Sequence, residues 1–216
     1  MDPPKVLIKT VGYTEYERAY KLWRHLIWDI SDELPLEYHR LFIVWGESRQ
    51  YDFPSLPSGR YAYWCANDST AWQIKADGTG LGKLISENWH SLTNQDPVKV
   101  ATFLLLFTGK GSRNTHHVIR DRADIQSMVT TYDILGEGGY VINERELAKV
   151  GDLCTWWVDK SADRATLQAL TLMGWMHDKR NIGIETVHIE REGAVSYAKR
   201  YVISQNVFKE TPLIMY

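Results

Sequence analysis

Apolar residues recur at steps of three and four along much of the chain, which is the spacing of an amphipathic helix. One example is the run Leu167, Leu170, Met173 and Met176. Asp96 followed by Pro97 is a typical helix start. The pattern predicts helices over residues 15–32, 35–46, 81–92, 98–107, 125–135, 143–158 and 161–176. The helix of residues 98–107 is expected to be central because it is apolar on nearly every side, and the last two helices are expected to form an antiparallel pair.

Alternation of apolar and polar residues is confined to three places. Residues 5–11 predict a strand, residues 60–76 predict a hairpin with a turn at Asn67–Thr70, and residues 182–203 favour a terminal hairpin turning at 191–193. We therefore expect an α+β fold that is predominantly helical with a small antiparallel sheet, made of the N-terminal strand, the central hairpin and a possible C-terminal hairpin. A single domain 1–216 is expected, with a possible subdivision into 1–56 and 57–216 at a proline-containing loop.

The composition indicates an ordinary folded protein but says little about its function. The chain has 216 residues, 44% hydrophobic and 24% charged, as in ordinary folded proteins, and its formal net charge is only -2. Cys65 and Cys154 form no CxxC motif, which argues against a zinc ribbon and suits a reducing compartment. The N-terminus does not resemble a signal peptide, and no apolar run approaches the roughly 20 residues of a membrane helix. We expect a cytoplasmic, intracellular protein without a transmembrane segment.

The residues that attract most attention form a basic loop that follows the most apolar run of the chain. Two glycines allow tight turns, and a helix starting near residue 122 would direct its positive end to the same place. Histidines could donate to phosphate or stack on a base. The loop is therefore a candidate site for nucleic acid or another polyanion, formed by Lys110, Arg113, His116, His117, Arg120 and Arg122.

Two other interpretations of the same loop remain open. The sequence His116-His117-Val118-Ile119-Arg120-Asp121 reads HHxxxD and resembles the first six positions of the HHxxxDG motif of coenzyme A dependent acyltransferases and peptide-synthetase condensation domains. The resemblance implies that His117 is a general base and that Asp121 orients the site, although Arg122 replaces the motif's glycine. Alternatively, His116 and His117 lie in a linker and the arginines pair with Asp121, Asp124 or acids elsewhere in the chain, where each exposed pair contributes about 0–1 kcal/mol.

Outside this loop, the sequence contains candidate residues for contact with a partner but no motif of a catalytic or metal site. No HExxH or paired-carboxylate spacing accompanies the other histidines, so we expect no metal and no cofactor. Trp156 and Trp157 are adjacent, and since both cannot face one core from a helix, Trp156 is expected to face a partner. The apolar tail, with Leu213, Ile214 and Tyr216, is expected to dock on the domain or on another subunit. The hypothesis is a non-catalytic binding and assembly protein that self-associates as a homo-oligomer and contacts an anionic partner; the alternative is an acyltransferase-like enzyme.

Overall fold

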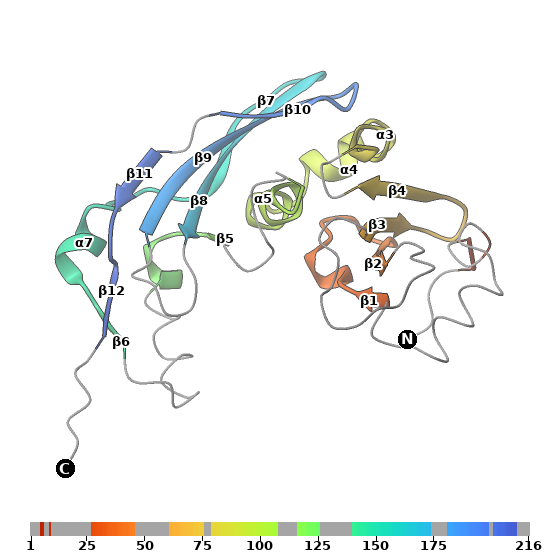
Figure 1. The fold of residues 1–216 in the computed structure, drawn as a ribbon. Helices are drawn as coiled ribbons and strands as arrows, with labels where there is room; N and C mark the ends of the chain where they lie inside the picture. Colours follow the sequence, from red (N-terminus) through yellow and green to blue (C-terminus); the bar gives the residue numbers. More distant parts are fainter. Residues whose placement is uncertain are drawn as a thin grey trace, which may run out of the picture. The chain divides into compact units, whose positions relative to one another are not determined.

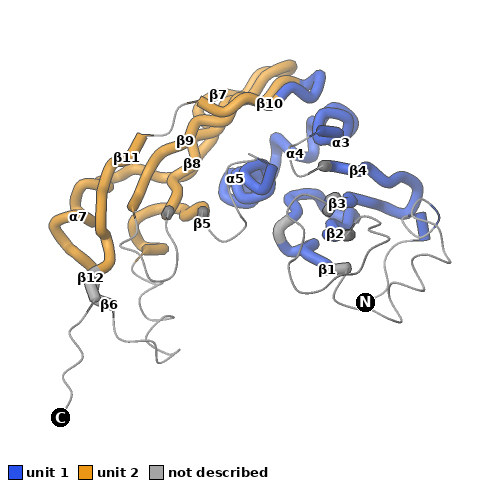
Figure 2. The backbone as a smooth tube through the Cα atoms, in the orientation of Figure 1, with its two compact units in different colours: residues 1–109, 191–194 blue, residues 110–190, 195–216 orange. Residues whose placement is uncertain are grey.

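The computed structural model describes residues 5–6, 9, 27–45, 61–75, 79–107, 116–125, 140–173, 181–198 and 201–210. The chain groups into two compact units, one made of residues 1–109 with 191–194 and the other of residues 110–190 with 195–216 (Figure 2). Each unit is described by itself. The expectation of a single domain, or of a division between residues 56 and 57, stays a prediction.

Unit 1 contains a four-stranded antiparallel sheet (Figure 1). Its strands follow the chain in order: β1 (Ile27–Asp29), β2 (Arg40–Trp45), β3 (Tyr61–Ala66) and β4 (Ala71–Lys75). Between β3 and β4, the side-chain oxygen of Asn67 accepts hydrogen bonds from the backbone N–H groups of Ser69 and Thr70, at 2.9 and 2.8 Å. An asparagine that satisfies its own turn in this way specifies the reversal locally. The predicted central hairpin is confirmed.

The short 3-10 helix η2 (Ser31–Glu33) lies between β1 and β2, and the α-helices of unit 1 follow the sheet: α3 (Leu81–Glu87), α4 (Trp89–Thr93) and α5 (Pro97–Leu105). The carboxylate of Asp96 accepts from the backbone N–H of Val98 at 2.8 Å, with Pro97 in the first turn, as the sequence predicts. Apolar residues of α5 are fully buried, and Phe103 meets Phe107 edge to face at 5.3 Å. The prediction of a buried helix here is confirmed.

Gly80 sets the start of α3. Its φ of +94° is in the left-handed region, and a Cβ at this position would lie 2.2 Å from the carbonyl oxygen of Gln73 in β4. No other residue type fits without displacing the strand, because only glycine lacks the Cβ atom that would collide there. The glycine-rich run of residues 78–82 therefore serves as a turn into α3 where the structure describes it.

Unit 2 is dominated by a six-stranded antiparallel sheet whose centre is the long pair β8 (Arg164–Met173) and β9 (Asn181–Glu190) (Figure 1). The strands β7 (Trp156–Lys160) and β5 (His116–Ile119) pair with successive parts of β8. On the other side, β10 (Val195–Tyr197) and β11 (Tyr201–Ser204) pair with β9 in the same manner. The predicted C-terminal hairpin is thus present. A separate two-stranded sheet joins β6 (Tyr140–Ile142) to β12 (Phe208–Glu210).

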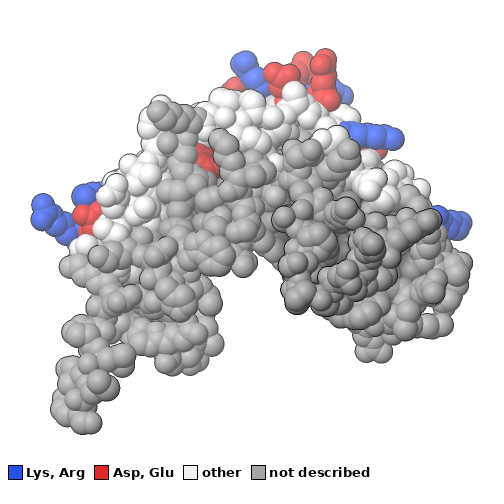
Figure 3. All heavy atoms as spheres, in the orientation of Figure 1, with Lys and Arg blue, Asp and Glu red and all other residues white. Residues whose placement is uncertain are grey.

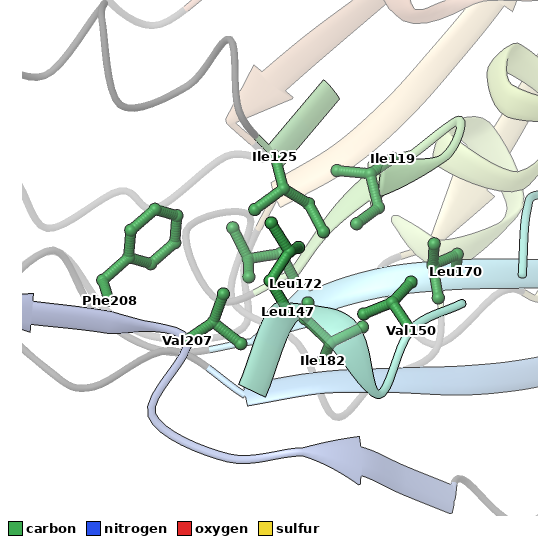
Figure 4. Close-up of a cluster of buried hydrophobic side chains, with 9 residues drawn as sticks. All are labelled: Ile119, Ile125, Leu147, Val150, Leu170, Leu172, Ile182, Val207 and Phe208. Atoms are coloured by element: carbon green, nitrogen blue, oxygen red, sulfur yellow. The ribbon is translucent and has the colours of Figure 1, made fainter. Parts of the chain in front are cut away.

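The core of unit 2 lies over one half of one face of the large sheet (Figure 4). Leu147 from the short helix α7 (Glu144–Ala148) packs against Leu172 of β8 and Ile182 of β9, all at most 1% exposed. The carboxylate of Glu146 in α7 accepts from the Ser204 hydroxyl and the Gln205 backbone, at 3.1 and 3.2 Å. These bonds join the chain at and after the end of β11 to α7, so long-range hydrogen bonds as well as apolar contacts hold the core together.

The expectation of a predominantly helical fold is wrong, because strands predominate over helices in the described part of the chain. Residues 161–176 show why. Ala169, Leu170, Thr171 and Leu172 are all buried, so the C-terminal half of β8 is covered on both faces and lacks the alternation of a half-exposed strand, whereas Ala165 and Leu167 alternate with the partly exposed Thr166 and Gln168. Apolar residues then fall at steps of three by coincidence.

Other predicted helices fail for related reasons. Residues 40–45 form β2, whose Leu41, Phe42 and Ile43 are buried on both faces. The helix expected over residues 143–158 stops at Ala148, and its Asn143 side chain makes no capping hydrogen bond. Ser161 does not begin a helix, since its hydroxyl and backbone bond Arg164 to close the turn between β7 and β8. The expected helical pair is a pair of antiparallel strands.

The N-terminal strand is also not found where the structure describes it. Lys5, Val6 and Lys9 have helical rather than extended backbones, and the remaining residues of 5–11 lie outside the described ranges. Of the helix expected over residues 15–32, the described part contains β1 and the start of η2 instead. Most of the helix expected over residues 125–135 lies outside the described residues. None of the described helices is long and apolar enough to span a membrane.

Candidate functional site

The basic loop is described only from residue 116 onward. Lys110 and Arg113 lie outside the described residues, and His116 contributes only its backbone, at the start of β5. The side chains of His117 and Arg120 are exposed. Arg122 lies 3.6 Å from the Glu144 carboxylate. One of the four predicted cations is therefore already paired with an acid of the chain, as the structural interpretation expects.

The backbone at the end of β5 is also occupied by the chain's own carboxylates. Asp124 accepts from the backbone N–H of Arg120 at 2.6 Å, and Asp121 accepts from that of Ala123 at 2.7 Å. The Ala123 amide belongs to the helical turn whose positive end was expected to attract an external anion, and the Arg120 amide lies just before that turn. Because two internal carboxylates already bond to them, the described part of the loop offers less to a phosphate than its sequence suggests. On the face of the molecule drawn in Figure 3, several described Lys and Arg side chains, not identified by residue, lie beside Asp or Glu side chains. Anion binding by this loop stays a prediction.

Thr155 joins β5 to β7 along the side of β8. Its hydroxyl donates to the Ile119 carbonyl at 2.6 Å and accepts from the Leu170 backbone N–H at 2.9 Å. Its own N–H donates to the Arg120 carbonyl at 2.8 Å, and the residue is only 4% exposed. One side chain thereby satisfies backbone groups at the point where the outer strand is interrupted, which fixes the start of β7 and hence the position of Trp156.

The other half of the same sheet face has a different character. Residues directly opposite each other in neighbouring strands point to the same face, so the registers place two rows of side chains beyond the core. One row runs from Asp159 through Thr166 to His188, and the next from Trp156 through Gln168 to Thr186. All six are at least partly exposed. We call this surface the polar sheet face: Trp156, Asp159, Thr166, Gln168, Thr186 and His188.

Hydrogen bonds within this surface hold two of its side chains in place. The Thr166 hydroxyl and the Nδ1 atom of His188 are 3.1 Å apart, and the amide nitrogen of Gln168 donates to the Cys154 carbonyl at 3.2 Å. Within the described part of the chain, these bonds leave the Nε2 atom of His188 and the amide oxygen of Gln168 without a partner. Both groups are therefore positioned by the fold while retaining hydrogen-bonding capacity for a ligand.

Trp156 forms the apolar edge of the polar sheet face. It is 46% exposed, whereas the neighbouring Trp157 points to the opposite face, where the Lys160 ammonium lies 5.6 Å from its ring centre. The expectation that the two rings point in different directions agrees with the structure, although a strand and not a helix separates them. Among the described residues, four of the five large exposed hydrophobics are in unit 2, and the remaining one is Tyr38, 92% exposed.

Both outer edges of the large sheet are interrupted. A register shift occurs in β7 between Trp157 and Asp159, and another in β11 between Val202 and Ser204. Short, bulged strands at a sheet edge are poor templates for the addition of another strand. The exposed face, and not the exposed edge, is therefore the better candidate for contact with a ligand.

The sequence pattern singles out Trp156 as a contact residue but none of the five polar residues around it. The sequence pattern places Thr166 and Gln168 in a helix, Asp159 in the link before it, and Thr186 and His188 in a terminal hairpin, so it does not reveal their common face. The available signal was the repetition of hydrogen-bonding residues two apart: Thr166 and Gln168 in one strand, Thr186 and His188 in the next. The predicted contact residues Leu213, Ile214 and Tyr216 lie outside the described residues, so their role stays a prediction.

Metal binding and catalysis by a cysteine nucleophile have little support in the described part of the chain. No group of three or more histidine, cysteine, aspartate or glutamate side chains able to hold a metal ion occurs there. Burial raises the pKa of the Cys65 thiol to about 12, so the thiol stays protonated and is a poor nucleophile. No family model matches the chain, and neither a curated protein nor a solved structure shows significant similarity to it.

Proposed function

We propose that the chain is a non-catalytic binding protein and that the polar sheet face is its ligand-binding surface. The observation that carries the proposal is the exposure of Trp156 beside side chains that are fixed by internal hydrogen bonds. Large aromatic residues are energetically important in binding surfaces because one rigid ring supplies much contact area at a small entropic cost. Ligand sites combine such apolar area with a few positioned polar groups, which here are Gln168 and His188.

The position of this surface in unit 2 also supports the proposal. The apolar cluster around Leu172 covers one half of the sheet face, and the polar rows occupy the other half. The central strands β8 and β9 pair over ten residues, and a site on paired strands keeps its geometry better than a site on a loop. The Thr155 hydrogen bonds fix the beginning of β7, so the Trp156 ring projects from a defined point.

A test that needs no knowledge of the natural ligand is fragment mapping by nuclear magnetic resonance. The full chain, labelled with ¹⁵N, is titrated with a set of small uncharged aromatic and polyol fragments. We expect amide shifts to gather at Trp156, Gln168 and Thr186, because binding surfaces attract fragments of many kinds. Shifts spread evenly over the protein, or gathered elsewhere, would contradict the proposal.

The chain provides a matched control on the same strand. Val158 is 45% exposed, almost as much as Trp156, but it lies at the irregularity in β7 and pairs with no residue of β8. Trp156→Ala should abolish fragment binding at the polar sheet face, and Val158→Ala should leave it unchanged. If both variants lose binding equally, general exposure of apolar area explains the result and the surface is not a specific site.

A further inference from the structure

The polar sheet face has the chemistry of a site for a neutral carbohydrate, and we infer that its ligand is an uncharged oligosaccharide. This inference rests on the proposed binding function. A sugar ring has hydroxyl groups around its rim and C–H bonds on its two faces. The exposed Trp156 ring offers a flat apolar surface to one face of a sugar, and the flanking side chains offer hydrogen bonds to its rim.

The kinds of polar group on this surface match hydroxyl ligands. A hydroxyl both donates and accepts, so it pairs best with groups of both kinds. Gln168 presents an amide oxygen, Asp159 a carboxylate and Thr186 a hydroxyl. The Nε2 atom of His188 donates or accepts according to the tautomer that the Thr166 contact selects. The two rows therefore contain both donors and acceptors within reach of a chain of hydroxyl groups.

The charge of the surface argues against an acidic ligand. Among its six residues, Asp159 is the one carboxylate, and neither lysine nor arginine belongs to the two rows. Arg164 is in the next row along the sheet, directly opposite Glu190. A phosphate or a uronic acid would meet the Asp159 charge without a compensating cation in the rows, so a neutral chain is favoured.

The size of the surface argues against a second copy of the chain or another protein. Strands lie about 4.8 Å apart, and side chains on one face recur about every 6.6 Å, so two rows cover on the order of 200 Å² across three strands, or about 250 Å² with β10, whose Ser196 lies opposite His188. Each partner in a standard protein interface buries about 800 Å², with several apolar residues at its centre. Trp156 is the one large apolar side chain of the polar sheet face. Its extent suits a few sugar units better.

The test compares neutral with acidic oligosaccharides on the full chain. Hexasaccharides of glucose with β-1,4 and with α-1,4 linkages are titrated into ¹⁵N-labelled protein, alongside a hexasaccharide of galacturonic acid. We expect one of the neutral chains to shift the amides of Trp156, Gln168 and Thr186, and the acidic chain to bind at least about tenfold more weakly. Equal or tighter binding of the acidic chain would overturn the inference.

Variants then assign the binding to the ring. Trp156→Ala should weaken the neutral ligand by about tenfold, the loss expected for one well-placed aromatic contact, while Trp156→Phe retains most of the affinity. Val158→Ala is the control for exposed apolar area. If Trp156→Ala binds as well as the wild type, the carbohydrate does not use this surface and the inference fails.

The outcome also separates this inference from the proposed function. If uncharged fragments map to the polar sheet face but neither neutral hexasaccharide binds there at millimolar concentration, the carbohydrate assignment is wrong and the binding surface stands. If a tryptophan-rich or proline-rich peptide pool shifts the same amides and the hexasaccharides do not, the ligand is a peptide. If neither fragments nor sugars bind, both proposals fail.

Discussion

Replacing Thr155 by valine tests the arrangement that positions the proposed binding surface. The hydroxyl of Thr155 bonds to the Ile119 carbonyl and the Leu170 N–H, at 2.6 and 2.9 Å. Valine has nearly the same shape but no hydroxyl, so Thr155→Val leaves one buried acceptor and one buried donor without their partner. The backbone N–H of residue 155 still donates to the Arg120 carbonyl.

The expected loss of stability follows from these two groups. A buried polar group that loses its partner costs about 1–3 kcal/mol, so the pair should cost about 2–4 kcal/mol if water partly replaces the hydroxyl. Thr155→Ser is the matched control, because it keeps the hydroxyl and loses one methyl group, which is worth about 1 kcal/mol. The serine variant should therefore be the more stable of the two.

Two measurements check this expectation. Guanidinium unfolding of unit 2, followed through ¹H–¹⁵N signals of β8 and β9, gives the free energy of unfolding for each variant. Hydrogen exchange gives the local effect, since the Leu170 amide should lose protection in Thr155→Val and keep it in Thr155→Ser. Equal stability of the two variants, with the Leu170 amide still protected in both, would refute the role assigned to this hydroxyl.

Further expectations concern other parts of the chain. Burial raises the pKa of Asp29, but hydrogen bonds from Ser31 and Arg40 outweigh it and leave that pKa below its ordinary value of 3.8. The stabilisation from the Asp29 carboxylate should thus be complete at a pH above 3.8 and be lost as the pH falls through its lowered pKa. The variant Asp29→Asn should lack this acid-dependent loss of stability. An acid unfolding profile identical to that of the wild type would contradict the role of Asp29. Gly80→Ala should destabilise unit 1 by more than about 2 kcal/mol, because the new Cβ atom collides with β4 and the residue also has a positive φ. Gly151→Ala also has a positive φ but open space around it, so it should cost only about 1 kcal/mol. Thermal unfolding of both variants measures the difference. Self-association predicts a mass above one chain in light scattering at high concentration, and a monomer there would count against it. If the basic loop binds polyanions, binding of a single-stranded oligonucleotide should weaken with salt and vanish after replacement by alanine of Lys110, Arg113, Arg120 and Arg122.

How far the sequence predicts this fold depends on how each segment is buried. The β3–β4 hairpin and the start of α5 are specified by local chemistry, through Asn67 in the turn and Asp96 at the helix start, and both were predicted correctly. The C-terminal half of β8 is buried on both faces, so its periodicity carries little information about its conformation. The choice between strand and helix there is made by pairing with β9, which lies beyond any local pattern.

The candidate site was predictable in part for the same reason. Trp156 could be singled out because two adjacent tryptophans cannot share one face. Gln168 and His188 could not, because only the register of β8 against β9 brings their rows together with Trp156. The basic loop shows the converse, since a cluster of charges in sequence includes Arg122, which the fold pairs with Glu144.

The most direct test of the account is whether a ligand contacts the Trp156 ring. The full chain, with its tryptophan rings isotopically labelled, is mixed with the neutral hexasaccharide that binds most tightly, and nuclear Overhauser effects between sugar and ring protons are measured. The account predicts contacts between sugar C–H protons and the Trp156 ring, together with a shift of its indole N–H signal. Contacts confined to other tryptophans, with the Trp156 signals unchanged, would contradict it.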